Sequence, residues 1–274
     1  MQGGLFSCKK TAALPGTDGN APIHDSLMRI TYNNVSVDVV VAKPEGDTVD
    51  ALLTFHGSVT WDSLIVPAAY TALDQTRDIT TVPNIMFVSV AYPEQGLLMG
   101  DNVRQSEAAL LWVKNEAARQ LGFHIRKVFM VGHSQGGYIV TRLNTMHATD
   151  GAVANGPGPL NLEYRCRLEA NGQIVASDYC GWMQDEYGSV LNNPGPYRDR
   201  SLLNFTDNHK SDILFVQGMQ DALIHMASYP LFKQKMESCT TCRGRQFYEA
   251  PNYGHTALFD SPDAKAVYNQ FLSR

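Results

Sequence analysis

The residues best suited to chemistry in this sequence lie in the run 132–136, which reads GHSQG and fits the pattern G-x-S-x-G. The run directly follows an apolar segment, 128–131, and begins a helical pattern that extends to about residue 147. A serine on a tight turn between a strand and a helix exposes its hydroxyl, and only small flanking residues permit such a turn. Unpaired N–H groups at the helix start can stabilise an oxyanion. The pattern predicts Ser134 as a nucleophile and the Gln135 amide as an oxyanion donor.

A serine hydroxyl is a poor nucleophile unless a base removes its proton, and an acid must orient that base. Of the eight histidines, His255 lies in a glycine-containing loop after the strand-like segment 245–249 and before the final helical pattern. His225 is the main competitor, but it follows the candidate acid by four residues and is expected to begin a helix. Asp221 comes just after a buried strand, and the order Ser, Asp, His suits this motif. We expect Ser134, His255 and Asp221 to act together; the alternatives are a helix-capping aspartate and ordinary surface or core histidines.

The segment after an earlier apolar run, 51–55, offers a second oxyanion donor. Gly57 permits a backbone turn that aims the Ser58 amide at the site, whereas His56 is expected to be structural. Three aromatic side chains are candidates for substrate binding, with core packing as the alternative: Trp61, Trp182 and Tyr187.

The elements that must position these residues alternate along the chain. Residues 30–41 alternate like two strands joined at Asn33-Asn34, a common turn dipeptide. Short apolar runs typical of strands buried on both faces lie at 51–55, 85–91, 128–131 and 213–216. Helical patterns lie between them, at 67–75, at 101–121 with Asp101 as N-cap and Gly122 as terminator, and at 136–147. The order predicts a three-layer, doubly wound, mostly parallel sheet with its functional residues at the carboxyl ends of the strands.

The chain of 274 residues is long enough for one large domain. Residues 1–25 have no apolar period and are interpreted as a flexible arm, and residues 26–274 as the domain. One stretch, about 157–211, is far longer than the usual connection between a strand and a helix. We interpret this insertion as a lid or substrate-binding wall over the active site; an ornamental surface loop is the alternative.

Composition excludes several function classes. A net charge of −5 without a cluster of basic residues removes the electrostatic basis for nucleic-acid binding. No stretch approaches the roughly 18 apolar residues of a membrane span.

Four of the five cysteines can form two local pairs, Cys166 with Cys180 and Cys239 with Cys242, which indicates a secreted or periplasmic protein. A cytoplasmic protein and a four-cysteine zinc site are the alternatives, and Cys8 is either a chance residue or part of a lipoprotein-like cleavage site.

Together, the segments around His56-Gly57, Ser134, Asp221 and His255 resemble those of the α/β-hydrolase superfamily, in particular its compact esterases and dienelactone-hydrolase-like branch. The resemblance runs from about Arg29 to Phe271. It implies hydrolysis of a small-molecule carboxylic ester through an acyl-enzyme intermediate, with no metal and no organic cofactor. The true dienelactone hydrolases carry cysteine at the position of Ser134, and the insertion matches no named subfamily. The alternatives are a peptidase or amidase with the same residues, and a non-catalytic binding protein of this fold; the oligomeric state stays open.

Overall fold

The computed structural model describes residues 24–93 and 100–274. The predicted N-terminal arm, including Cys8, lies outside the described residues up to position 23. His24 and Asp25, which the sequence assigned to that arm, already belong to the first strand.

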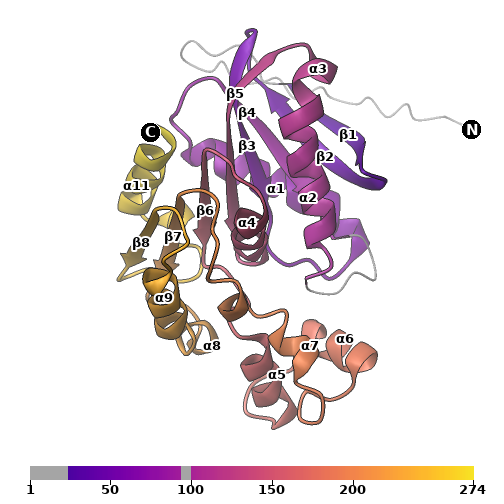
Figure 1. Ribbon diagram of the computed structural model, residues 1–274, viewed down its shortest axis with the longest axis vertical. Helices are drawn as coiled ribbons and strands as arrows, with labels where there is room; N and C mark the ends of the chain where they lie inside the picture. The colour runs from indigo at the N-terminus through magenta and orange to yellow at the C-terminus, as the bar shows by residue number, and fades with distance from the viewer. Residues whose placement is uncertain (1–23, 94–99) are drawn as a thin grey trace, which may run out of the picture.

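A single sheet of eight strands forms the centre of the molecule, in the order β1-β2-β4-β3-β5-β6-β7-β8 (Figure 1). The six strands from β3 to β8 run parallel, and β2 is antiparallel to both of its neighbours, β1 and β4. The predicted mostly parallel, doubly wound sheet is therefore confirmed. The bounds are β1 (His24–Tyr32), β2 (Val35–Lys43), β3 (Thr48–Phe55), β4 (Ile85–Ala91), β5 (His124–His133), β6 (Gly151–Asn155), β7 (Ile213–Gly218) and β8 (Arg245–Ala250).

The order of the strands reverses between β3 and β5. The chain passes from β3 outward to β4 and then returns to the other side of β3 as β5. The loops that follow β3 and β5 consequently diverge, and such a reversal is where open α/β sheets form ligand crevices. The predicted hairpin is also present, because Asn33 and Asn34 join β1 to β2 with φ values of 48° and 62°. Both residues are in the left-handed region that this two-residue turn requires.

Helices cover both faces of the sheet and make the three layers. Alternate residues of the central strands point to opposite faces, so that Leu53 belongs to one apolar cluster and Leu52 to the other. The cluster of Leu53 also contains side chains of α2 (Val103–Trp112), α4 (Gln135–Met146) and α9 (Tyr229–Ser238). The cluster of Leu52 contains side chains of α1 (Ile65–Ile79), α10 (Ala257–Asp260) and α11 (Pro262–Leu272). No helix in the described ranges is long and apolar enough to cross a bilayer.

The predicted helix over 101–121 differs in its start and in its interior. Helix α2 begins after Asn102, and the predicted cap Asp101 instead lies 3.5 Å from Arg200. A π-helical turn, Val113–Ala117, separates α2 from α3 (Ala118–Leu121). Such a turn contains one residue more than an α-helical turn, and the pattern of apolar residues did not predict it. Gly122 ends α3 in the left-handed conformation, as predicted, with φ 71°.

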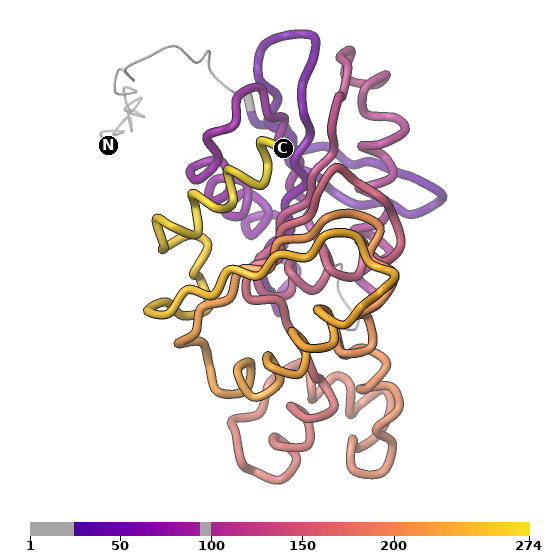
Figure 2. Tube along the Cα trace, turned by 60° about the vertical axis from the view of Figure 1, so that its left-hand side comes forward, coloured from indigo at the N-terminus to yellow at the C-terminus, as the bar shows by residue number. Residues whose placement is uncertain are grey.

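The insertion, residues 157–211, forms a helical lobe beyond one end of the sheet, which Figures 1 and 2 show from two sides. It contains α5 (Leu162–Ala170), α6 (Asp178–Tyr187) and α7 (Gly195–Arg198). A disulfide joins Cys166 on α5 to Cys180 on α6. Because β6 and β7 are neighbours in the sheet, the insertion leaves and re-enters the domain at adjoining strands. The second disulfide, Cys239–Cys242, follows α9. The short helix α8 (Leu223–Met226) precedes α9 in the chain.

Candidate active site

Ser134 lies on the turn between β5 and α4 with φ 57° and ψ −115°. A residue other than glycine held at positive φ costs about 1–3 kcal/mol, so the surrounding structure must enforce this conformation. The flanking glycines permit it, because a Cβ on Gly132 would lie 2.1 Å from the carbonyl oxygen of Gly136. A Cβ on Gly136 would lie 1.9 Å from the carbonyl oxygen of Phe55. The turn therefore brings the start of α4 against the end of β3 and raises Ser134 above the strand ends.

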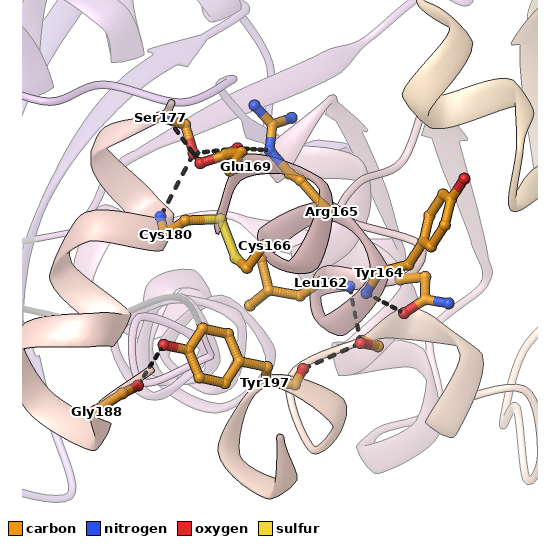
Figure 3. Close-up of a disulfide and its surroundings, with 11 residues drawn as sticks. Leu162, Tyr164, Arg165, Cys166, Glu169, Ser177, Cys180, Gly188 and Tyr197 are labelled. Carbon is orange, nitrogen blue, oxygen red and sulfur yellow. Dashed lines mark hydrogen bonds and ion pairs between the residues drawn. A yellow bond between two sulfur atoms is a disulfide. The ribbon is translucent and has the colours of Figure 1, made fainter. Parts of the chain in front are cut away.

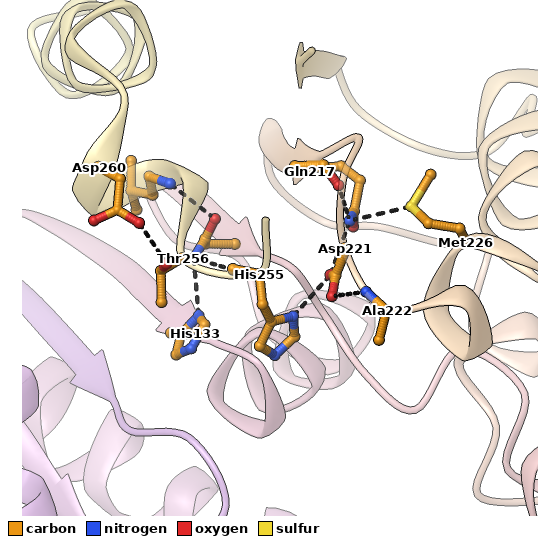
Figure 4. A network of polar contacts seen from close by, with 11 residues as sticks. His133, Gln217, Asp221, Ala222, Met226, His255, Thr256 and Asp260 are labelled. Carbon is orange, nitrogen blue, oxygen red and sulfur yellow. Dashed lines mark hydrogen bonds and ion pairs between the residues drawn. The ribbon is translucent and has the colours of Figure 1, made fainter. Parts of the chain in front are cut away.

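Asp221 and His255 form a hydrogen-bonded pair (Figure 4), with Nδ1 of the imidazole 2.7 Å from Oδ2 of the carboxylate. Asp221 follows β7, and its side chain is only 2% exposed. The carboxylate also accepts from the Gln217 side chain at 3.0 Å and from the Ala222 amide at 2.6 Å. Burial raises the pKa of Asp221, but the His255 hydrogen bond and the charges of nearby histidines outweigh burial and lower it. Asp221 is therefore ionised at neutral pH and holds a proton on Nδ1, which leaves Nε2 free to act as a base.

Asn155, at the carboxyl end of β6, connects the Ser134 turn to the His255 loop. Its carbonyl oxygen accepts from the Ser134 amide at 2.9 Å. Its side chain donates to the His255 carbonyl at 3.3 Å and accepts from the Leu258 amide at 3.1 Å. Asn155 is buried, and the sequence analysis did not predict a role for it. Among the described residues, no hydrogen bond joins the Ser134 hydroxyl to the His255 imidazole, a contact that often tightens only when substrate binds.

Two further histidines flank His255. The His133 ring centroid lies 4.8 Å away, and burial, followed by the charge of His255, lowers the pKa of His133 to about 4. The His225 ring centroid lies 4.9 Å from that of His255, and burial is the main cause that lowers the pKa of His225. Sequence reasoning set His225 aside as a competing base, and the structure places it beside the predicted base instead. Both neighbours are neutral at neutral pH, so neither adds a second positive charge when His255 accepts a proton.

The two predicted oxyanion donors lie on either side of Ser134. Gln135 is the first residue of α4, where helix amides lack intrahelical partners. Ser58 follows Gly57, whose Cβ position is 3.6 Å from the Ser134 Cβ, so the loop after β3 passes close to the nucleophile. The Ser58 amide has no protein acceptor within the described part of the chain. His56 is structural, as expected, because its Nδ1 lies 2.6 Å from the Gly57 carbonyl and burial lowers its pKa to about 4.

A pocket of about 380 Å³ opens beside Ser134. Ser58 and His225 also line it, and the insertion supplies much of the remaining wall through Asn161, Leu162, Arg165, Ser177 and Tyr179. Sequence reasoning missed Tyr179 and Arg165. Helix α6 had not been predicted, and a helical rotation of about 100° per residue decides which side chains face the pocket.

The three aromatic residues expected to bind substrate do not line this pocket. Trp61 is 70% exposed on the short turn that begins α1, although its neighbour Thr60 lines the pocket. Trp182 packs edge-on against Tyr179, with ring centroids 5.5 Å apart. The Tyr187 hydroxyl accepts a hydrogen bond of 2.7 Å from Arg200.

Asp221, His225 and His255 are also the one group of described residues that could hold a metal ion, since their ligand atoms lie within 4.8 Å of one another. The carboxylate oxygen and Nδ1 already share a proton at 2.7 Å, and the positive charge of Arg165 acts on His225. Both features favour a hydrogen-bonded pair over a cation at this place.

The fold and the position of the strained serine define an α/β-hydrolase fold. Neither the comparison with family models nor that with curated proteins found a match. Among solved structures, the chain is similar to an esterase from the archaeon Pyrobaculum calidifontis, with TM-score 0.67 and 18% identity over 92% of this chain and 85% of that one.

Two other solved structures are similar over nearly the whole chain. One of two fungal esterases from Rhizomucor miehei has TM-score 0.65 and 14% identity, and the match covers 93% of this chain and 83% of the esterase. The acylaminoacyl peptidase of Pyrococcus horikoshii has TM-score 0.60 and 14% identity, over 92% of this chain but only 42% of the peptidase. At these identities the likeness establishes the fold.

Proposed function

We propose that this protein is a serine hydrolase that cleaves carboxylic esters through an acyl-enzyme intermediate. The observation that carries the proposal is the strained turn at Ser134, together with the hydrogen-bonded Asp221–His255 pair at the same edge of the sheet. Three residues that are distant in sequence follow β5, β7 and β8 at one edge of the sheet, and each has the chemistry that its role needs.

Each step of the reaction uses groups of this chain. His255 Nε2 takes the Ser134 proton as the Ser134 oxygen attacks the ester carbonyl, and the oxyanion is stabilised by the Ser58 and Gln135 amides. The imidazolium then gives its proton to the leaving alcohol as the acyl–oxygen bond breaks. Water attacks the acyl-serine as His255 takes its proton. The imidazolium then gives this proton to the Ser134 oxygen as the acyl–serine bond breaks, and the acid product leaves. Asp221 stays ionised throughout and stabilises the transient imidazolium.

An ester substrate is preferred to a peptide for one structural reason. The solved esterases match this chain over 83% and 85% of their own length, whereas more than half of the acylaminoacyl peptidase lies outside the match. This chain builds its pocket wall from the insertion instead. We therefore propose the insertion, residues 157–211, as the substrate-binding wall of the enzyme.

Labelling with a fluorophosphonate probe tests the proposal most directly. We expect one adduct, located on Ser134 by peptide mass spectrometry and absent from the Ser134→Ala variant. Hydrolysis of p-nitrophenyl esters should disappear in the same variant, and matching p-nitroanilides should be turned over far more slowly by the wild type. An unlabelled and inactive wild-type protein would indicate a binding protein, whereas faster turnover of the anilides would indicate an amidase.

A secreted or periplasmic location is also proposed, because both disulfides need an oxidising compartment. Thiol titration of the denatured protein, isolated from its native source without reductant, tests this. The proposal expects one free thiol before reduction and five afterwards; five free thiols before reduction would favour the cytoplasm.

A further inference from the structure

Tyr179, on the insertion, reaches the two segments that carry the proposed oxyanion donors. Its hydroxyl donates to the side-chain oxygen of Gln135, at a distance of 2.5 Å. The side chain of Ser58 interacts with the same hydroxyl and lowers the pKa of Tyr179, while burial, the larger effect, raises it. The phenol is therefore protonated and can donate at any pH at which the enzyme would work. The hydroxyl thus bonds to Gln135, and Tyr179 lines the same pocket as Ser58 and Ser134.

The hydroxyl of Tyr179 fixes the side chain of Gln135 at the start of α4. The Gln135 side chain is 1% exposed, and its Nε2 is buried without a hydrogen-bond partner among the described residues. Its Oε1 depends on Tyr179. Ser58, by contrast, lies in a loop outside any helix or strand, and its position relative to α4 is not set by a backbone ladder. Tyr179 is the described side chain that bonds to Gln135 and lines the pocket beside Ser58.

The start of α6, which carries Tyr179, is held by contacts within the insertion, and Figure 3 shows those of Ser177 and Arg165 with Glu169. Ser177 caps α6 and donates from its amide and its hydroxyl to the Glu169 carboxylate, at 2.8 Å and 2.9 Å. Arg165 donates to the same carboxylate at 2.9 Å. The next residue after Tyr179 is Cys180, which the disulfide joins to α5. A hydroxyl anchored in this way has little freedom to move away from the active site.

We propose that Tyr179 is a positioning residue that holds the Ser58 loop against the start of α4, so that the two oxyanion amides converge on one point. This inference rests on the proposed function and adds to it a role for the insertion in catalysis as well as in substrate binding. Donors act on the transition state only when they are fixed in place, and a displacement of about 1 Å can cost on the order of 10²-fold in rate.

The test is the Tyr179→Phe variant, which removes one oxygen and keeps the ring. We expect kcat for a p-nitrophenyl ester to fall about 10- to 100-fold with KM changed less than threefold. Affinity for a trifluoromethyl ketone, which forms an oxyanion on the serine, should fall by the same factor. The matched control is Tyr197→Phe, because Tyr197 is also a buried tyrosine of the insertion, with its hydroxyl donating to the Gly188 carbonyl at 2.8 Å. We expect its kcat to stay within about twofold.

Gln135→Met breaks the same hydrogen bond from the other side and serves if Tyr179→Phe does not fold. If the two residues act together, the double variant should be no slower than the more impaired single variant. A folded Tyr179→Phe enzyme with unchanged kcat, or with lower kcat but unchanged ketone affinity, would overturn the inference while leaving the serine hydrolase intact. A wild type that neither turns over esters nor reacts with the fluorophosphonate would instead overturn the proposed function.

Discussion

Replacing Asp221 with asparagine should disable the base without disturbing the fold. The amide has to put either its oxygen or its NH₂ group where Oδ1 accepts from the Ala222 backbone amide at 2.6 Å. That backbone donor cannot move, so the oxygen takes this position, and the NH₂ group takes that of Oδ2, facing His255. Gln217 loses its bond to Oδ2, which is 3.0 Å long, but still donates to the Gly218 carbonyl at 2.9 Å.

An NH₂ group facing Nδ1 forces the imidazole into its other tautomer, with the proton on Nε2, where it cannot accept the Ser134 proton. We expect kcat/KM to fall about 10⁴-fold, which corresponds to about 5 kcal/mol of transition-state stabilisation. The assay is ester hydrolysis at pH 7, together with nitrogen NMR of the His255 ring and a thermal melt. The control is Asp260→Asn, at the end of helix α10, which follows the loop that carries His255. Activity within tenfold of wild type, or a proton still on Nδ1, would refute the reasoning.

Three further predictions follow from close packing, from buried histidines and from the disulfide of the insertion. Gly136→Ala should not fold, since its methyl group would lie 1.9 Å from a carbonyl oxygen at the end of β3; circular dichroism and soluble yield report this. His56 and His133 have pKa values lowered to about 4, so the unfolded chain binds more protons between about pH 6.5 and 4. The stability from each, up to about 3 kcal/mol, should be present above pH 6.5 and lost as pH falls through this window, as urea midpoints will show. Cys166→Ser combined with Cys180→Ser opens a loop of 14 residues and should lower the unfolding free energy by about 3 kcal/mol and also lower kcat.

Matched variants separate these effects from general damage. Gly181→Ala adds a methyl group that meets nothing within 4 Å on a helix, and it should fold normally. Removing Cys239 and Cys242 together opens a loop of only three residues and should leave kcat unchanged. A urea midpoint that does not change between pH 7 and pH 4.5 would contradict the assignment of neutral buried histidines. Full activity after loss of the Cys166–Cys180 disulfide would show that Tyr179 is not anchored through it.

Local patterns predicted the elements that carry the reacting groups. The apolar run before Ser134, the small residues around it and the helical pattern after it all act within a few residues, so the strand–turn–helix unit could be inferred directly. The Asn33-Asn34 hairpin was equally local. Asp221 and His255 were found from strand ends and chain order, and their contact at 2.7 Å follows from parallel strands ending at one edge.

The pocket could not be inferred in the same way. Its wall comes from a segment without a regular apolar period, and the contact between Tyr179 and Gln135 joins residues 44 positions apart. Sequence reasoning selected Trp182 and Tyr187 on α6, yet Tyr179 lines the pocket and Trp182 packs against it. The role of Asn155 was missed because a buried amide that bonds to backbone groups leaves no pattern in the chain.

The insertion begins and ends at two neighbouring strands, and this has an evolutionary consequence. Because β6 and β7 are neighbours, residues 157–211 can lengthen, shorten or be exchanged as one cassette. The order of the strands that carry Ser134, Asp221 and His255 then stays the same. The cassette has its own cross-link, Cys166–Cys180, and its buried side chains belong to the same apolar cluster as one face of the sheet. Selection for a new acyl or alcohol group can therefore act on this segment first, and the same boundaries are the natural joints for building chimaeric enzymes.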